Sequence, residues 1–316
     1  MDWELKKELK EQLQEEQGYY IYPVGTRTRF ALVYPNSYFV GMSNLGFHII
    51  YDLLNKRQDT ACERVFLPER TKIQRYINTR TSIMSIETQS PLYDFDVLGF
   101  AVSFEMDYFN VLQLLEMGKI KLKASERGER DPIVIAGGPC PTFNPEPLSA
   151  IFDAFIIGEG EVIMPAFMDA YHAAKREGVP RQEMLRRLAE VPGVYVPSLY
   201  EHHYDDKGHL TSIKPLEGAP EKVSRQWVKD LDAYPAHTVV VTDNTEFNFS
   251  SSRRRAAAAA TAVSAWQATV SANRATARSP SSTKRCRKPS STASASASWA
   301  QPSRIIPKST SSARIS

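Results

Sequence analysis

Short apolar runs alternate with amphipathic segments between residues 20 and 178. The first run, Phe30–Tyr34, is almost wholly apolar and ends at Pro35-Asn36, which is typical of a strand buried on both faces. A helix is expected next, at Leu45–Leu54. The pattern then recurs, and the further expected strands and helices are Ala61–Leu67, Thr71–Asn78, Asp96–Phe104, Asp107–Met117, Pro132–Ala136, Glu146–Ile151, Ala154–Ile157 and Glu161–Lys175. Five such units predict an α/β fold with a doubly wound parallel sheet over residues 20–178.

The flanking segments have a different pattern. Residues 1–19 are expected to form a helix, because Leu5, Leu9 and Leu13 make one apolar stripe. Residues 179–235 are interpreted as a helix at Arg181–Glu190, a small β appendage with a hairpin at Tyr200–Lys214, and a linker. Residues 236–249 contain another apolar run, which predicts a strand that starts a new unit.

The charges divide the chain into two parts. Residues 1–249 contain 27 Lys and Arg against 36 Asp and Glu, whereas residues 250–316 contain 12 basic and no acidic residues. Ser, Ala, Thr and Arg make up 49 of these last 67 positions. A segment so poor in large apolar residues is expected to be disordered, because it cannot offset its ordering entropy.

Glycine, acidic and polar residues follow the expected strands. In a parallel sheet the ligand site lies at the carboxyl ends of the strands, where these loops gather. Glycine also lets the backbone approach a flat or phosphate-bearing ligand closely. Tight turns and a capped helix start are the competing interpretations of the glycine motifs. The candidate cofactor-binding residues are Tyr38, Gly41, Met42, Ser103, Glu105, Gly137, Gly138, Pro139, Gly158, Glu159, Gly160 and Glu161.

Other chemistry is less well supported by the sequence. Neither GxGxxG nor GxxxxGK[ST] is present, which disfavours ordinary dinucleotide-binding and NTPase folds. His202 and His203 are adjacent on an expected strand and therefore point to opposite faces, so a solvated hairpin is favoured over a metal site. Cys140 at a loop tip has no basic neighbour in sequence that would activate it. No catalytic residue and no metal ligand is therefore assigned.

Three features bear on cellular location. No stretch approaches the ~18 consecutive apolar residues of a membrane span. Residues 1–17 are charged with both signs and do not resemble a secretory signal. The three cysteines, Cys62, Cys140 and Cys286, are isolated and odd in number, which excludes a disulfide framework. A cytoplasmic protein without membrane contact is expected.

Four motifs together indicate a family. They are Gly137-Gly138-Pro139, Pro145-Glu146, Phe152–Glu161 and Val228–Pro235. Over roughly residues 20–249 the chain resembles the N-terminal half of radical S-adenosylmethionine (radical SAM) proteins that carry a cobalamin-binding-like domain.

The resemblance implies a flavodoxin-like domain followed by a partial TIM-type barrel, of which residues 236–249 are the first strand. It also implies a CxxxCxxC loop in that barrel, which holds a [4Fe–4S] cluster and leaves one iron for S-adenosylmethionine. Cobalamin is the implied ligand of the first domain. It would bind without the Asp-x-His-x-x-Gly histidine, which is missing here, and the domain could equally hold none.

The chain itself contains no CxxxCxxC. A reading frame displaced by one base over Arg253–Ala272 permits cysteine codons that overlap Ala258, Ala262 and Ala265, which gives this spacing. We therefore expect a frameshifted tail over residues 250–316, a truncated barrel and an inactive fragment. Such a chain binds no [4Fe–4S] cluster and cleaves no S-adenosylmethionine.

A second function class stays open at this point. The alternative is a non-catalytic module that binds a small-molecule ligand and contacts nucleic acid through its basic tail. The sequence does not indicate a macromolecular substrate under either hypothesis.

Overall fold

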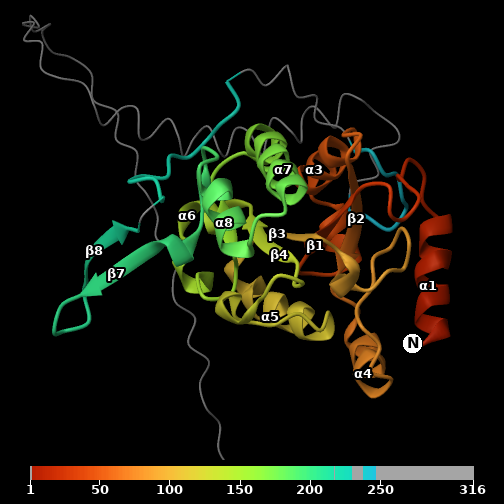
Figure 1. The fold of residues 1–316 in the computed structure, drawn as a ribbon. Coiled ribbons are helices and arrows are strands. Elements are labelled where there is room, and N and C mark those ends of the chain that lie inside the picture. The colour runs from red at the N-terminus through yellow and green to blue at the C-terminus, as the bar shows by residue number, and fades with distance from the viewer. Residues whose placement is uncertain (1, 217, 230–237, 247–316) are drawn as a thin grey trace, which may run out of the picture. The chain divides into compact units, whose positions relative to one another are not determined.

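A six-stranded sheet forms the centre of the protein in a computed structural model that describes residues 2–216, 218–229 and 238–246 (Figure 1). The strand order is β2-β1-β3-β4-β5-β6. The first five strands are parallel, and β6 pairs antiparallel with β5. These strands are β1 (Thr28–Tyr34), β2 (Thr60–Phe66), β3 (Val97–Ala101), β4 (Ile133–Gly137), β5 (Ala154–Ile156) and β6 (Val194–Tyr195).

Helices cover both faces of this sheet. They are α1 (Trp3–Gln14), α2 (Tyr38–Met42), α3 (Leu45–Asn55), α4 (Arg70–Asn78), α5 (Tyr108–Met117), α6 (Pro139–Phe143), α7 (Gly160–Glu177) and α8 (Arg181–Ala189). One apolar core contains side chains of α3, α7 and α8, and a second contains side chains of α4 and α5. Figure 1 shows α3 and α7 on one side of the strands and α5 on the other.

Alternation of side chains along each strand builds the two cores. In β1, Phe30 and Leu32 enter the core under α3 and α7, and Ala31 and Val33 enter the opposite one. Gly99 of β3 leaves room for a neighbour, because a Cβ there would lie 2.5 Å from the ring of Phe30. Burial on both faces explains why the parallel strands are apolar throughout.

The expected parallel strands and most of the expected helices are confirmed. The helix expected at Glu146–Ile151 is wrong, since only a short 3₁₀ turn, Glu146–Leu148, forms there. Pro147 lacks a backbone N–H, and the chain then turns into β5. The sequence also missed α6, which directly follows Gly138.

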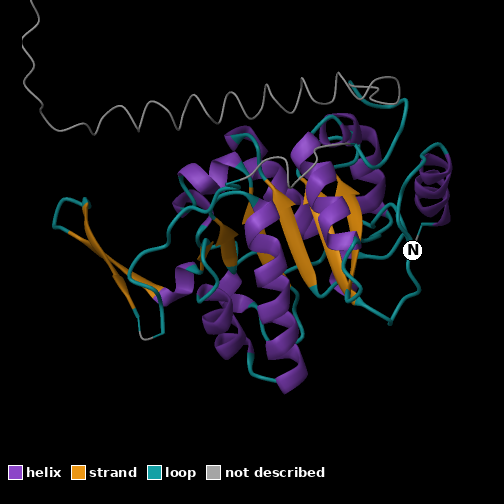
Figure 2. Ribbon diagram, turned by 90° about the horizontal axis from the view of Figure 1, so that it is seen from above, coloured by secondary structure: helices purple, strands orange, loops and turns teal. Residues whose placement is uncertain are grey.

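The sheet extends further along the chain than expected. β6 belongs to residues assigned to the β appendage, yet it pairs with β5 through Phe155 and Tyr195. The hairpin itself is confirmed as β7 (Tyr200–Tyr204) and β8 (Leu210–Pro215), which project to one side of the sheet in Figure 2. A regular strand does not form at residues 238–242, where Val241 makes a single antiparallel bridge to Gln17.

Some expectations concern residues outside the described ranges. The tail at 250–316 and most of the segment that joins the linker to residue 238 are among them. Within the described ranges, no helix is long and apolar enough to cross a bilayer.

Candidate functional site

The loops that follow β1, β3, β4 and β5 gather at one edge of the sheet. In Figure 2 the arrowheads of the long parallel strands point to this edge. The topology therefore brings the candidate residues to one side of the molecule, as parallel strands require. Their individual contacts show that they have different roles there.

The residues after β1 are turned into the protein. Ser37 caps α2, and the Tyr38 hydroxyl donates a hydrogen bond to Glu16 Oε1 at 2.5 Å. A Cβ on Gly41 would lie 2.4 Å from the ring of Phe66, so that glycine permits close packing. Met42 is buried, and its sulfur lies 3.4 Å from Arg64 Nη1. Tyr38, Gly41 and Met42 thus pack against interior residues beneath the loop that follows β1.

A set of polar side chains joins the loops after β1 and β3. Asn36 and Asn110 both donate amide hydrogen bonds to Asp107 Oδ1, at 2.8 and 3.1 Å. Asp107 is buried, and its Oδ2 has no hydrogen-bond partner among the described residues. Burial raises the pKa of Asp107, although the two amide donors oppose that shift.

The loop after β3 is the open part of the edge. Ser103 is half-buried and accepts a hydrogen bond from Asn44 at 3.4 Å, whereas Glu105 is exposed. Phe104 and Met106 are 58% and 80% exposed. Large apolar side chains this exposed on a loop are uncommon unless something covers them in use.

At the end of β4, Gly137 and Gly138 lie where the backbone contacts the loop that follows β3. Gly138 has φ +108°, and a Cβ on it would lie 2.7 Å from the carbonyl oxygen of Val102. Val102 in turn donates its N–H to the carbonyl of Gly137 at 2.9 Å. Pro139 then starts α6, at whose end Phe143 is exposed. Contact with the neighbouring loop therefore explains the glycine at position 138.

The loop after β5 is paired with the linker. Gly158 has φ +128° and bridges Gln226, whose N–H donates to the carbonyl of Ile157 at 3.1 Å. The Glu159 carboxylate accepts a hydrogen bond from the N–H of Val228.

The first turn of α7 follows this loop. A Cβ on Gly160 would lie 2.6 Å from Ile50. Glu161 is half-buried, and desolvation raises the pKa of its carboxyl group.

The candidate residues therefore fall into three groups along one edge. Those after β1 contact the interior. Of those after β5, Gly158 and Glu159 contact the linker and Gly160 lies against Ile50. Those after β3 and β4 are half-buried or exposed. We call the loops Ser103–Met106 and Gly137–Phe143 the central edge. Its exposed apolar side chains are Phe104, Met106 and Phe143.

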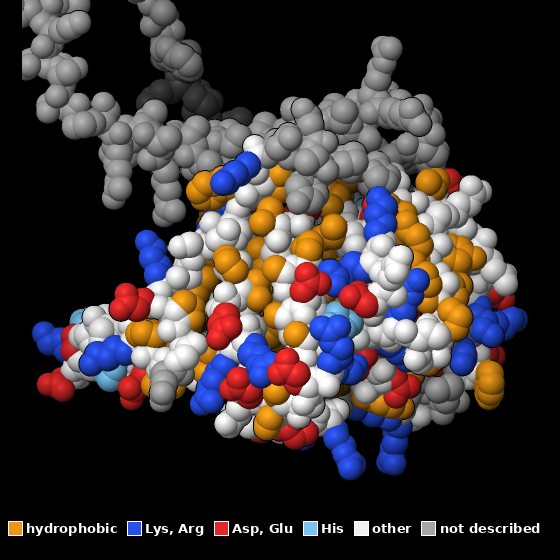
Figure 3. Space-filling model, turned by 45° about the horizontal axis from the view of Figure 1, so that its top comes forward, with side chains coloured by type: hydrophobic (Ala, Val, Ile, Leu, Met, Phe, Trp, Pro, Cys, Tyr) orange, Lys and Arg blue, Asp and Glu red, His pale blue; other side chains and the backbone are white. Residues whose placement is uncertain are grey.

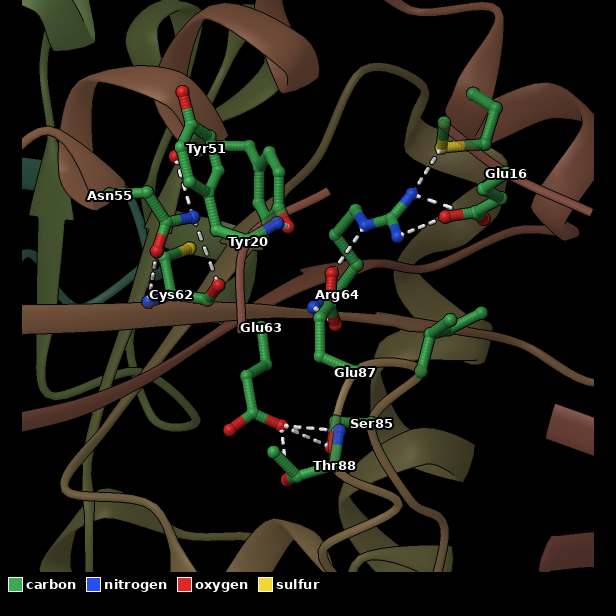
Figure 4. A network of polar contacts seen from close by, with 12 residues as sticks. Glu16, Tyr20, Tyr51, Asn55, Cys62, Glu63, Arg64, Ser85, Glu87 and Thr88 are labelled. Atoms are coloured by element: carbon green, nitrogen blue, oxygen red, sulfur yellow. Dashed lines mark hydrogen bonds and ion pairs between the residues drawn. The ribbon is translucent and has the colours of Figure 1, made fainter. Parts of the chain in front are cut away.

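A buried ionic cluster lies beside the residues after β1, and the sequence interpretation missed it. Arg64 of β2 is 1% exposed and donates to Glu16 Oε2 at 2.5 Å and to Glu87 Oε1 at 2.6 Å (Figure 4). Burial alone would lower the pKa of Arg64, but the two carboxylates raise it above its usual value. Burial also raises the pKa of Glu87. The charged pair Glu63-Arg64 inside an apolar strand was the available signal, because buried charges need partners.

Neither histidines nor cysteines assemble into a centre in the described part of the chain. His202 lies 3.1 Å from Glu146, and His209 lies 3.0 Å from Asp205. No group of three or more His, Cys, Asp or Glu residues in the described ranges has the arrangement of a metal site. Burial raises the pKa of Cys62 well above the usual thiol value and that of Cys140 to about 11. Both thiols are therefore poor nucleophiles and poor metal ligands.

On the face seen in Figure 3, the described surface has no large patch of a single charge. Lys and Arg side chains are interspersed there with Asp and Glu. A basic patch for nucleic acid is therefore not a feature of that face.

Comparison with known proteins finds similarity over the region of the sheet. Residues 46–197 match the family described as "Radical SAM proteins, N-terminal". An uncharacterized protein of Methanocaldococcus jannaschii, MJ0966, is 28% identical over 131 residues, which are 42% of this chain and 24% of the relative. No solved structure matches the chain. The family match covers the chain from α3 to just past β6, and it supports a radical SAM family protein.

Proposed function

We propose that this chain is the N-terminal, cofactor-domain part of a radical SAM iron–sulfur enzyme. The match of residues 46–197 to the N-terminal region of radical SAM proteins carries this proposal. The 131 residues aligned with MJ0966 make up 24% of that relative's length, so the chain spans about a quarter of that protein. The reaction, its substrate and the catalytic domain belong to the proposal.

The radical SAM family implies S-adenosylmethionine and a [4Fe–4S] cluster in its intact members. Cysteine thiolates hold such a cluster. Cys62 lies on β2 and Cys140 on α6, both are buried, and their raised pKa values disfavour the thiolate form. The described residues therefore do not fit a cluster. No chemical step is assigned to this part of the chain.

The displaced reading frame offers a source for the missing ligands. Cysteine codons that overlap Ala258, Ala262 and Ala265 would supply CxxxCxxC after the linker. These positions lie outside the described residues. The chain as written would then be a fragment that does no radical chemistry.

Sequencing the codons between Glu246 and Ser251 tests this proposal most directly. We expect one inserted or deleted base that restores an open frame with CxxxCxxC. The gene with that base corrected should give a brown protein with cluster absorbance, and the same gene with the three restored cysteines changed to serine should not. An undisturbed genomic frame without the motif would overturn the proposal.

Cobalamin is the ligand we propose for the first domain, at the central edge. The order of the first five strands, 2-1-3-4-5, is that of flavodoxin-like sheets, which bind ligands at the carboxyl ends of β1 and β3. The central edge contributes the loop after β3 to that place. The exposed Phe104, Met106 and Phe143 would supply an apolar surface for a flat ring. The conformation of Gly138 does not bear on this, because contact with Val102 already requires a glycine there.

Titration of the full chain with hydroxocobalamin, followed by absorbance, tests the ligand. We expect binding to be lost in Phe104→Asp/Met106→Asp. It should be retained in Ile213→Asp, which changes an exposed apolar residue on the distant hairpin. No binding by the unchanged chain, or equal binding by both variants, would contradict a cobalamin site at the central edge.

The alternative of a nucleic-acid-contacting module is not favoured. The family match points to radical SAM proteins, and the basic tail on which that alternative depends lies outside the described residues. A cytoplasmic location is part of the main proposal. Cys62 and Cys140 are unpaired thiols, as is usual in a reducing compartment.

A further inference from the structure

After the linker the chain packs against the connection between α1 and β1. Gln17 and Val241 exchange two backbone hydrogen bonds, with N···O distances of 3.0 and 2.9 Å. Val240 and Thr242, on either side of the bridge, are both buried. We call residues 239–246 the docking segment.

A second point of attachment lies at the end of α2. The Thr245 hydroxyl donates to the carbonyl of Met42 at 3.2 Å, and the N–H of Glu246 donates to Ser43 Oγ at 2.9 Å. The docking segment is therefore held at both of its ends against elements next to the carboxyl end of β1. Whatever polypeptide follows residue 246 starts from this place.

Gly18 makes the first attachment possible. Its φ is +86°, and a Cβ there would lie 2.2 Å from the carbonyl oxygen of Val239. Gly25 has a similar φ of +91° in the same connection between α1 and β1, but a Cβ there would meet nothing within 4 Å. The two glycines differ mainly in their contact with the docking segment.

The buried ionic cluster fixes the residue before this bridge. Glu16 precedes Gln17, and its carboxylate accepts hydrogen bonds from Arg64 and Tyr38. The side chain of Thr242 in the docking segment also lowers the pKa of Tyr38, against the larger raising effect of burial. Arg64 itself is fixed on β2 and paired with Glu87 (Figure 4).

Such a cluster is poorly explained as a source of stability. Desolvation of buried charges largely offsets their attraction, and apolar replacements of whole clusters are often neutral or stabilising. Buried polar groups can instead specify one geometry among several. Here the ion pairs and hydrogen bonds of Glu16 fix its position. They thereby fix the neighbouring Gln17, with which Val241 of the docking segment pairs.

We propose that residues 17–18 and 42–43 are the receiving surface for the docking segment, and that Glu16, Tyr38 and Arg64 are positioning residues for it. This surface fixes the position of residue 246, where the described part of the chain ends. The consequence for a cluster-bearing domain depends on the proposed function. The docking itself does not, since it can be measured without any cofactor.

Hydrogen exchange of the full chain, read peptide by peptide, tests the receiving surface. In Gly18→Ala we expect exchange in residues 239–246 to accelerate by roughly tenfold or more, because backbone hydrogen bonds there are lost. Peptides of β1, β3 and β4 should keep their rates. Gly25→Ala, the matched control, should leave the docking segment as it is. Unchanged exchange of residues 239–246 in Gly18→Ala would overturn the proposal.

Tyr38→Phe tests the positioning role, because it removes one hydroxyl and keeps the ring against Phe66. Faster exchange confined to residues 239–246 is the expected result. Tyr195→Phe removes a comparable bond, from its hydroxyl to Glu146 at 2.6 Å, on the other side of the sheet. This control should not affect the segment. If Tyr38→Phe accelerates the sheet peptides by the same factor as residues 239–246, its role is general stability and the positioning claim fails.

Discussion

The carbonyl oxygen of Val102 lies 2.7 Å from the place where a Cβ on Gly138 would stand. Two neighbouring loops thus cross in contact at the centre of the carboxyl edge. Gly138 also has φ +108°, a backbone conformation that residues other than glycine rarely adopt. The requirement for glycine here is a property of the fold before any ligand is considered.

We therefore predict that Gly138→Ala lowers the free energy of unfolding by about 2–4 kcal/mol through strain and steric overlap. Urea denaturation of the full chain, followed by circular dichroism, measures it. Gly208→Ala in the hairpin turn is the control, because Gly208 has φ +80° but open space around it. Equal effects of the two substitutions would mean that backbone strain alone matters.

The Arg64 cluster gives a second prediction. Arg64→Leu leaves the carboxylates of Glu16 and Glu87 buried without a cation, and should destabilise the protein by about 3–5 kcal/mol. Combining it with Glu16→Gln and Glu87→Gln should recover most of that loss.

The partly exposed Arg187, which pairs with Glu177 and Glu183, provides the comparison. Arg187→Leu should destabilise the protein far less than Arg64→Leu, because surface ion pairs contribute little. All of these free energies come from denaturant titrations. If the triple variant is as unstable as Arg64→Leu, uncompensated charge is not the cause.

Glu161 gives a prediction about pH. Its pKa is raised by desolvation in the folded protein, so the folded state holds this proton more tightly than the unfolded chain does. The resulting stability is present below the unfolded pKa and is lost as pH rises through the folded pKa.

Glu161→Gln should consequently raise the stability at pH 7 and leave it nearly unchanged near pH 3.5. Unfolding free energies measured across this range give the result, with the exposed Glu116→Gln as control. A benefit of Glu161→Gln that is the same at both pH values would contradict the desolvation argument.

The cysteines give a prediction about cluster assembly. Cys62 and Cys140 are buried with raised thiol pKa values, so iodoacetamide at pH 8 should label them only after denaturation. Incubation of the folded chain with iron and sulfide should yield no [4Fe–4S] absorbance. Labelling of either thiol in the folded chain would show that burial does not protect it.

The alternation of residue types was sufficient to predict the central sheet. β1 reads Thr28–Tyr34 with apolar residues on both faces, and the same pattern in the other parallel strands indicated helices on both sides. The local sequence pattern did not predict strands that form only by pairing with a segment distant in the sequence. β6 is two residues long and exists because Phe155 of β5 lies beside Tyr195.

The candidate loops were predicted to share an edge, and the topology places them there. Their roles could not be read from spacing. Tyr38 turns inward because Glu16 accepts its hydroxyl, and Gly158 is held by Gln226. Each partner comes from a distant part of the sequence.

The sequence by itself thus determined which segments become strands and helices, because side-chain periodicity matches the geometry of each element. It also placed a charged pair, Glu63-Arg64, inside a buried strand. Only the tertiary structure decided that Glu16 and Glu87 neutralise Arg64 and that Val241 pairs with Gln17. Contacts between groups distant in sequence depend on how the packed elements bring them together, and no local pattern records that.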